Sequence, residues 1–93
     1  MAVIDIRRKH GRSIKDAKTA VERVAKAIAK EYGLTHEWDG NELRFGRSGV
    51  KGTIGVAKQD VHIHVELGFL VGALKPVIER EITRKLDEEF ADA

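Results

Sequence analysis

Cysteine is absent from the sequence, and proline, methionine and tryptophan each occur once. The absence of cysteine excludes disulfides, thiolate metal sites and a cysteine nucleophile, and it fits a reducing compartment. No apolar run reaches the roughly 20 residues that a membrane-spanning helix needs. Residues 1–10 also lack the apolar segment and the small-residue cleavage site of a secretory signal peptide. We therefore expect a soluble, cytoplasmic protein with no transmembrane segment.

Patterns that indicate catalysis are absent as well. Catalysis requires a nucleophile beside a base, or carboxylates whose surroundings move their pKa values apart, and the spacing assembles neither arrangement. Ser13 and Ser48 are better explained by helix capping and turn formation. No glycine-rich phosphate loop is present either. The sequence therefore predicts a non-enzymatic protein with no catalytic residues and no cofactor.

Aromatic residues are scarce, and charge is unevenly distributed. Residues 1–33 contain nine Lys and Arg against four Asp and Glu, whereas residues 67–93 contain four against six. A basic first third permits contact with nucleic acid, but strong nucleic-acid binders usually show a larger excess of charge with interleaved aromatic residues. Only three Phe, one Trp and one Tyr occur in the chain. Composition therefore does not favour nucleic acid as a partner.

The length of 93 residues and the hydrophobic content of 42% suit one compact domain, which we assign to residues 1–93. Residues 3–8 alternate apolar and charged side chains, which predicts a strand. Ser13, with Asp16 three residues later, is typical of a helix start, and Gly33 is a suitable left-handed end. The predicted buried face of this helix is rich in alanine and consists of Ala17, Ala20, Val21, Val24, Ala25, Ile28 and Tyr32.

Residues 34–67 keep a period of two, with turn signals at residues 39–41, 48–49 and 58–60. Four strands fit in this span, each with one apolar and one charged face. Only one face of such a sheet needs cover, as is common for antiparallel meanders. The predicted fold class is α+β with the order β-α-β-β-β-β-α. It consists of a single twisted antiparallel sheet, in strand order 1-5-4-3-2, with two helices on one face.

An amphipathic helix dominates the last third of the chain. Apolar residues recur at every fourth position, opposite a face of alternating charges. The predicted core stripe consists of Leu74, Val77, Ile78, Ile82, Leu86 and Phe90, with Ala73 alongside. Pro76 fits only the first turn of a helix. The helix therefore either starts close to Leu74, or starts near Leu70 and bends at Pro76.

The segment that precedes this helix is unusually apolar. Phe69, Leu70 and Val71 lie between Gly68 and Gly72. We favour the interpretation in which these three side chains bend inward and close the end of the core. If they are exposed instead, they form a contact surface for a protein partner, a lipid or a polymer.

Two histidines offer a candidate metal site. His62, His64 and Glu66 occupy alternate positions, so their side chains emerge on the same face of a strand. Imidazole and carboxylate groups are ligands for zinc and similar ions. The same residues suit the solvated face of a sheet, opposite charged residues on neighbouring strands. We favour the solvated face and assign no metal site, which leaves metal binding by His62 and His64 open.

A basic cluster lies near the start of the chain and consists of Arg7, Arg8, Lys9 and Arg12. Such a cluster can bind phosphate groups or the acidic surface of a partner. More often its residues lie in a solvated turn and pair across the sheet with acids such as Asp5. We favour the solvated turn.

Several segments together suggest a family. They are Asp5-Ile6-Arg7-Arg8-Lys9-His10, Leu43-Arg44-Phe45, Arg47-Ser48-Gly49-Val50 with Gly52 and Ile54, Glu66-Leu67-Gly68-Phe69-Leu70, Lys75, Ile78-Glu79, Glu81-Ile82 and Leu86-Asp87. With these residues the chain resembles, over nearly its whole length, the polyhydroxyalkanoic acid system proteins, also described as granule-region proteins. The resemblance implies a small cytoplasmic bacterial protein linked to the storage of polyhydroxyalkanoate, a water-insoluble polyester kept as granules. It carries no catalytic or metal residues over to this chain.

We therefore expect a non-enzymatic accessory protein of the polyhydroxyalkanoate storage system, with Phe69, Leu70 and Val71 as its contact residues. Its partner is a granule surface, a granule-associated protein or a second copy. One alternative is a nucleic-acid-binding module that uses the basic cluster. Another is a small-ligand or metal-binding domain that uses the concave space between sheet and helices. The sequence leaves open whether the charged sheet face pairs with a second copy in a homodimer.

Overall fold

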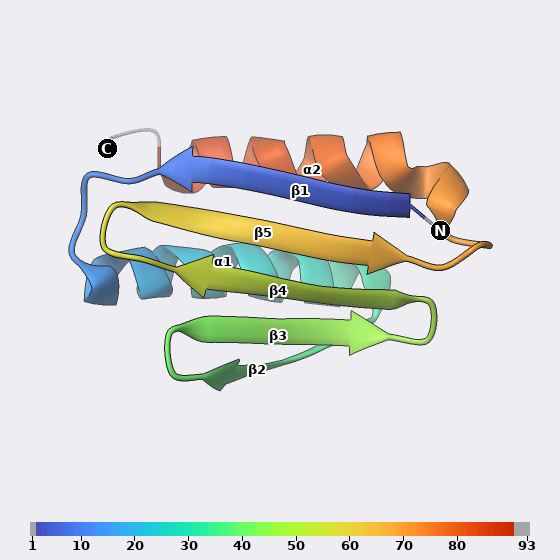
Figure 1. Ribbon diagram of the computed structural model, residues 1–93, viewed down its shortest axis with the longest axis horizontal. Coiled ribbons are helices and arrows are strands. Elements are labelled where there is room, and N and C mark those ends of the chain that lie inside the picture. The colour runs from blue at the N-terminus through green and yellow to red at the C-terminus, as the bar shows by residue number, and fades with distance from the viewer. Residues whose placement is uncertain (1, 91–93) are drawn as a thin grey trace.

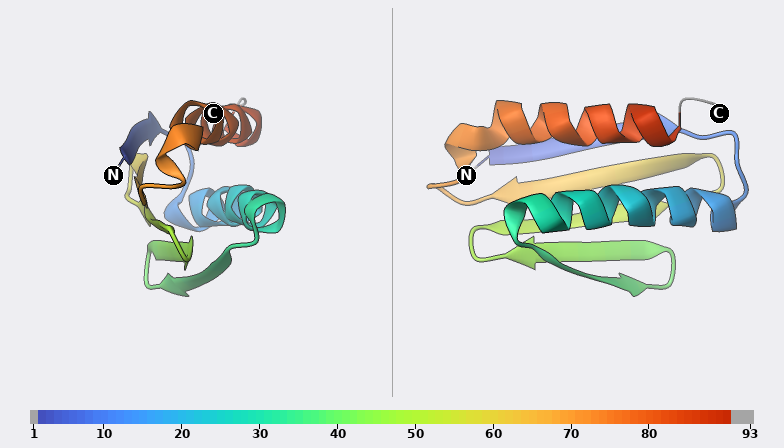
Figure 2. Two further views of the ribbon diagram at one scale, coloured as in Figure 1. Left: turned by 90° about the vertical axis from the view of Figure 1, so that its right-hand side faces the viewer. Right: turned by 180° about the vertical axis from the view of Figure 1, so that it is seen from behind.

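The computed structural model describes residues 2–90, which form one antiparallel sheet and two α-helices. The elements in chain order are β1 (Ala2–Lys9), α1 (Ile14–Tyr32), β2 (Thr35–Asp39), β3 (Glu42–Arg47), β4 (Val50–Val56), β5 (Asp60–Leu67), the short 3₁₀-helix η1 (Gly72–Leu74) and α2 (Lys75–Glu89). The sheet order is β1-β5-β4-β3-β2, and both helices cover the same face (Figures 1 and 2). The predicted α+β fold and strand order are confirmed.

Helix α1 begins and ends where its capping residues predict. The Ser13 hydroxyl accepts a hydrogen bond from the backbone N–H of Asp16 at 3.1 Å. Gly33 adopts a left-handed conformation, with φ of 68°, and its N–H donates to the carbonyl of Ala29. The face of α1 that meets the sheet is largely alanine, including the fully buried Ala17 and Ala20. Small side chains let the helix lie close to the strands.

Strand β5 lies between β1 and β4, and its residues alternate strictly between the two faces of the sheet. The side chains that point toward the helices, Val61, Ile63, Val65 and Leu67, are all buried. His62, His64 and Glu66 point to the opposite, outer face and are half-buried. A single strand thus supplies both a core layer and the middle of the polar outer face.

Helix α2 starts at Lys75, directly after η1, and Pro76 occupies its first turn. This outcome selects the start close to Leu74, without a bend at Pro76. Ile78, Ile82 and Leu86 are buried against the sheet, and Phe90, just beyond the helix, is only 1% exposed. These four residues confirm most of the predicted core stripe.

Two other members of the predicted core stripe are not core. Leu74 is 47% exposed and Val77 is 48% exposed, and Ala73 is exposed as well. Val77 directly precedes the buried Ile78, so it is turned by about 100° around the helix axis, away from the sheet. Leu74 precedes the first turn of α2 and belongs to η1. The stripe therefore reaches the sheet only from Ile78 onward.

Two glycines on β4 provide a test of the packing between β3 and β4. Gly52 lies opposite Phe45 on the inner face, and a Cβ atom added to Gly52 would lie 2.3 Å from the Phe45 ring. Gly55 points to the outer face, where a Cβ atom would meet no atom within 4 Å. We predict that Gly52→Ala lowers the free energy of unfolding in urea by about 1–3 kcal/mol, because it overpacks the site.

Gly55→Ala is the matched control and should leave stability unchanged or slightly higher, because glycine weakens a strand interior. In a Phe45→Leu background the cost of Gly52→Ala should shrink. Equal stability of Gly52→Ala and Gly55→Ala would show that the packing of the Phe45 ring does not require a glycine at position 52.

Candidate functional site

The loop between β5 and η1 is closed by its own backbone. The N–H groups of Val71 and Gly72 both donate to the carbonyl of Gly68, at 3.1 and 2.8 Å. Gly68 is itself held to the β3–β4 turn, because its N–H donates to the carbonyl of Gly49 at 2.8 Å. Leu74 adds a further bond to the carbonyl of Val71 at 2.9 Å. The loop is therefore fixed at both ends, and its middle projects.

Phe69 and Leu70 form the projecting part, which we call the apolar tip, and each is 89% exposed. The favoured prediction that residues 69–71 all bend inward is therefore wrong for these two. It holds in part for Val71, which is half-buried and packs against the core. A Cβ atom on Gly49 would lie 3.1 Å from the Val71 Cγ2 atom, so Val71 packs directly on the β3–β4 turn. Val71 closes the end of the core, and the tight turn leaves the other two side chains outside.

Exposed apolar side chains concentrate at the end of the molecule that carries the apolar tip. Among residues 2–90, the large hydrophobic side chains classed as exposed are Val3, Phe69, Leu70, Leu74 and Val77. The first residues of β1, the loop, η1 and the start of α2 all lie at this end (Figure 1). A Cβ atom on Gly72 would lie 3.6 Å from the Ala2 Cβ atom, which brings β1 beside η1. Exposed apolar side chains from several segments therefore gather at this end of the fold.

The basic cluster does not form a single surface. Arg8 forms an ion pair with Asp87 of α2. The Arg12 guanidinium donates to the carbonyl of Glu89 and lies 4.9 Å from the centre of the Phe90 ring. These two cations therefore hold the end of α2 against β1. Only Arg7 and Lys9 point to the outer face, opposite His62 and Asp60.

On the outer face, the two histidines of β5 contact Asp5, which was not part of the candidate metal site predicted from the sequence. His62 Nε2 lies 2.9 Å from Asp5 Oδ1, and His64 Nδ1 lies 3.1 Å from Asp5 Oδ2. Asp5 stands opposite His64 in the β1–β5 register, a pairing that no sequence spacing reveals. Asp5 pairs with these histidines, whereas pairing with the basic cluster was expected.

Glu66 is not among the partners of this histidine pair. Within residues 2–90, no group of three or more His, Cys, Asp or Glu side chains has an arrangement suited to a metal ion. The hydrogen bonds from His64 and then His62 hold the pKa of Asp5 below its ordinary value. The arrangement is a hydrogen-bonded, solvated cluster on the sheet.

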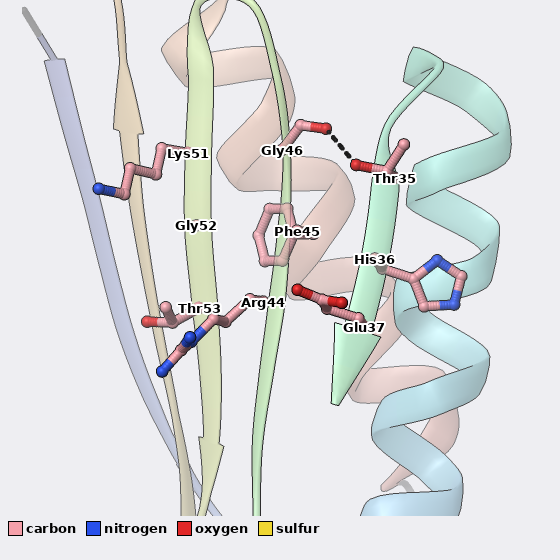
Figure 3. A pocket seen from close by; sticks show the side chains of 9 residues that line it. All are labelled: Thr35, His36, Glu37, Arg44, Phe45, Gly46, Lys51, Gly52 and Thr53. Carbon is pink, nitrogen blue, oxygen red and sulfur yellow. Dashed lines mark hydrogen bonds between the residues drawn. The ribbon is translucent and has the colours of Figure 1, made fainter. Parts of the chain in front are cut away.

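A wide hollow of about 560 Å³ lies on β2, β3 and β4 (Figure 3). Its charged side chains are Glu37, Arg44 and Lys51. Arg44 forms ion pairs with Asp39 at 2.9 Å and with Glu42 at 3.2 Å, so its charge is largely matched. His36 points away toward α1, as Figure 3 shows, and contacts Glu22 at 3.4 Å. The polar groups of the hollow do not converge on a common point.

Comparison with known proteins assigns this chain to a family. Residues 4–90 match the family described as "Putative polyhydroxyalkanoic acid system protein". The chain belongs to the polyhydroxyalkanoic acid system protein family. No curated protein and no solved structure matches the chain. The match includes both the apolar tip and the histidine pair, so both lie within the family region.

Family membership confirms the resemblance inferred from the sequence. The polyhydroxyalkanoic acid system match runs from residue 4, within β1, to residue 90, just after α2. Within residues 2–90, no helix combines the length and the apolar character that a membrane span requires.

The Asp5 cluster predicts a pH dependence. Because the pKa of Asp5 is lower in the folded state, the ionised carboxylate stabilises the fold above about pH 4. That contribution is lost as pH falls through the folded-state pKa. In an NMR titration the Asp5 carboxyl should show a midpoint below about 3.9.

Replacing both His62 and His64 by Ala should raise the Asp5 midpoint toward the ordinary value. His36→Ala, which removes an imidazole far from Asp5, serves as the control and should leave the midpoint unchanged. A midpoint that stays low in the double variant would show that the histidines are not the cause.

Proposed function

We propose that this chain is a non-enzymatic accessory protein of polyhydroxyalkanoate storage that attaches to the granule surface in the cytoplasm. The observation that carries the proposal is the apolar tip, with Phe69 and Leu70 each 89% exposed at the end of a hydrogen-bonded loop. Exposed aromatic and leucine side chains in a fixed loop are costly in water and mark a contact surface. Family membership supports the storage polyester as the setting.

The energy of such a contact can be bounded. Complete burial of a Phe or Leu side chain is worth about 1.5–3 kcal/mol, so the two residues of the tip contribute about 3–6 kcal/mol. Leu74 and Val77, each about half exposed, can add to this if the surface reaches η1. Part of the gain is offset by the lost freedom of the bound protein. The proposed attachment is therefore reversible and depends on each tip residue.

The apolar tip lies away from the polar outer face of the sheet. The tip lies at the end of the sheet, beyond β5, whereas the histidine cluster lies on the flat of the sheet. Attachment through the tip would leave the outer face free for water or for another protein. A granule-associated protein is the alternative partner. Comparing binding to bare polymer particles with binding to native granules distinguishes the polymer surface from a granule protein.

The test uses tip variants on two surfaces. Phe69→Ser and Leu70→Asp should each reduce binding to protein-free polyhydroxyalkanoate particles in a sedimentation assay by at least about tenfold, because each removes about 1.5–3 kcal/mol of apolar contact. The same variants, fused to a fluorescent protein, should stay diffuse in polymer-accumulating cells.

Ala57→Asp is the matched control. It adds the same charge to an exposed residue in the β4–β5 turn, at the opposite end of the sheet, and should leave particle binding unchanged. Wild-type binding to native granules but not to bare particles would assign the partner as a granule protein. Unchanged particle binding by Leu70→Asp would contradict the proposal.

A further inference from the structure

An apolar groove of about 250 Å³ lies between α1 and α2, next to the loop that carries the tip. Its helical walls include Ile28 of α1 and Ile82 of α2. Its floor includes Val50 and Val65 of the sheet, and Val71 and Leu74 line the end nearest the loop. The half-buried Phe45 of β3 also lines the groove. Space therefore remains between sheet and helices.

Two polar side chains line this groove, Arg47 from β3 and Tyr32 from α1. The Arg47 Nη1 atom donates to the backbone carbonyl of Tyr32 at 2.9 Å, which fixes the guanidinium beside the end of α1. Within residues 2–90, Arg47 forms no ion pair with a carboxylate. A fixed cation without a matching anion thus stands at the edge of an apolar space.

The acids near the groove are already matched. Glu31 of α1 and Glu81 of α2 lie 4.0 and 3.8 Å from the ammonium group of Lys85. Burial, followed by the charges of Glu31 and Glu81, raises the pKa of Tyr32, so its phenol stays protonated and can donate a hydrogen bond. Arg47 and Tyr32 therefore both present donors to a ligand.

We propose that this groove binds a linear acyl chain that ends in a carboxylate, with the chain between the helices and the carboxylate on Arg47. An apolar cavity of about 150 Å³ is large enough to hold benzene in another protein, so the present groove has room for a longer chain. A guanidinium and a carboxylate form the strongest common type of hydrogen-bonded pair. For its biological setting the proposal rests on the proposed function, since hydroxyalkanoic acids are acyl carboxylates.

The test measures binding of hexanoate, octanoate and decanoate to the full chain by titration calorimetry and NMR, at concentrations where each acid is monomeric. Affinity should rise by about fourfold for each added methylene until the groove is full. The amide signals that move should include those of Val71, Leu74 and Ile82. Absence of saturable binding by decanoate would overturn the proposal.

Paired variants locate the chain and the carboxylate. Arg47→Met should lower the affinity for decanoate by at least about tenfold and leave the affinity for 1-decanol unchanged. The reason is that it removes only a hydrogen bond to a charged group. Lys51→Met, which removes an exposed cation on the outer face, should change neither. Equal binding of decanoate to Arg47→Met and wild type would overturn the assignment of Arg47.

Leu74→Trp should fill the groove and abolish binding, whereas Val77→Trp, on an exposed position outside the lining, should not. Thermal unfolding of each variant checks that the fold is intact. A dimer in sedimentation that is lost in Phe69→Ser, together with no decanoate binding, would assign the groove to the tip of a second copy and overturn the proposal.

The two proposals fail separately. Leu70→Asp should lose particle binding and keep its affinity for decanoate. Arg47→Met should lose affinity for decanoate and keep particle binding. If Leu70→Asp also lost decanoate binding, the groove and the tip would be one site, which would overturn the separate acyl site.

Discussion

The apolar inner face of the sheet must be shielded from water, and most of the structure depends on how the two helices do this. Strand β5 contributes four fully buried side chains to that face, and its neighbours β1 and β4 add Ile4 and Ile54. Helix α1 covers the sheet with alanine and valine at close range, while α2 covers it with larger aliphatic residues and Phe90. An apolar groove remains between the two helices near the loop that carries the tip.

The attachment of α2 explains why the four cations of the basic cluster do not lie together on one surface. Arg8 and Arg12 lie at one end of α2, where they meet Asp87, the last carbonyl groups and the Phe90 ring. Cations near the C-terminal end of a helix also complement its dipole. Arg8 and Arg12, two of the four cations of the basic cluster, therefore contribute to the packing of the fold.

Much of the fold could be predicted because its signals are local. The alternation along β5, the Ser13 cap and the Gly33 end each depend on a few neighbouring residues. The Asp5 cluster could not be predicted, since it depends on the register between strands separated by most of the chain. The exposure of Phe69 and Leu70 was predicted only as the alternative, because hydrogen bonds to the Gly68 carbonyl, and not hydrophobicity, decide which way the loop side chains point. The prediction was wrong for Leu74 and Val77, because Leu74 lies before the first turn of α2 and Val77 is turned away from the sheet.

The strand order has a consequence for the way the chain folds. Strand β1 pairs only with β5, so Ala2 meets Leu67 across most of the sequence, whereas β2, β3 and β4 are joined by short hairpins. Contacts between distant residues form slowly because a long loop must close first. During synthesis, the hairpins can assemble while β1 has no partner. Strand β1 is therefore synthesised before the other strands but is among the last to enter the sheet, and completion of the core waits for α2.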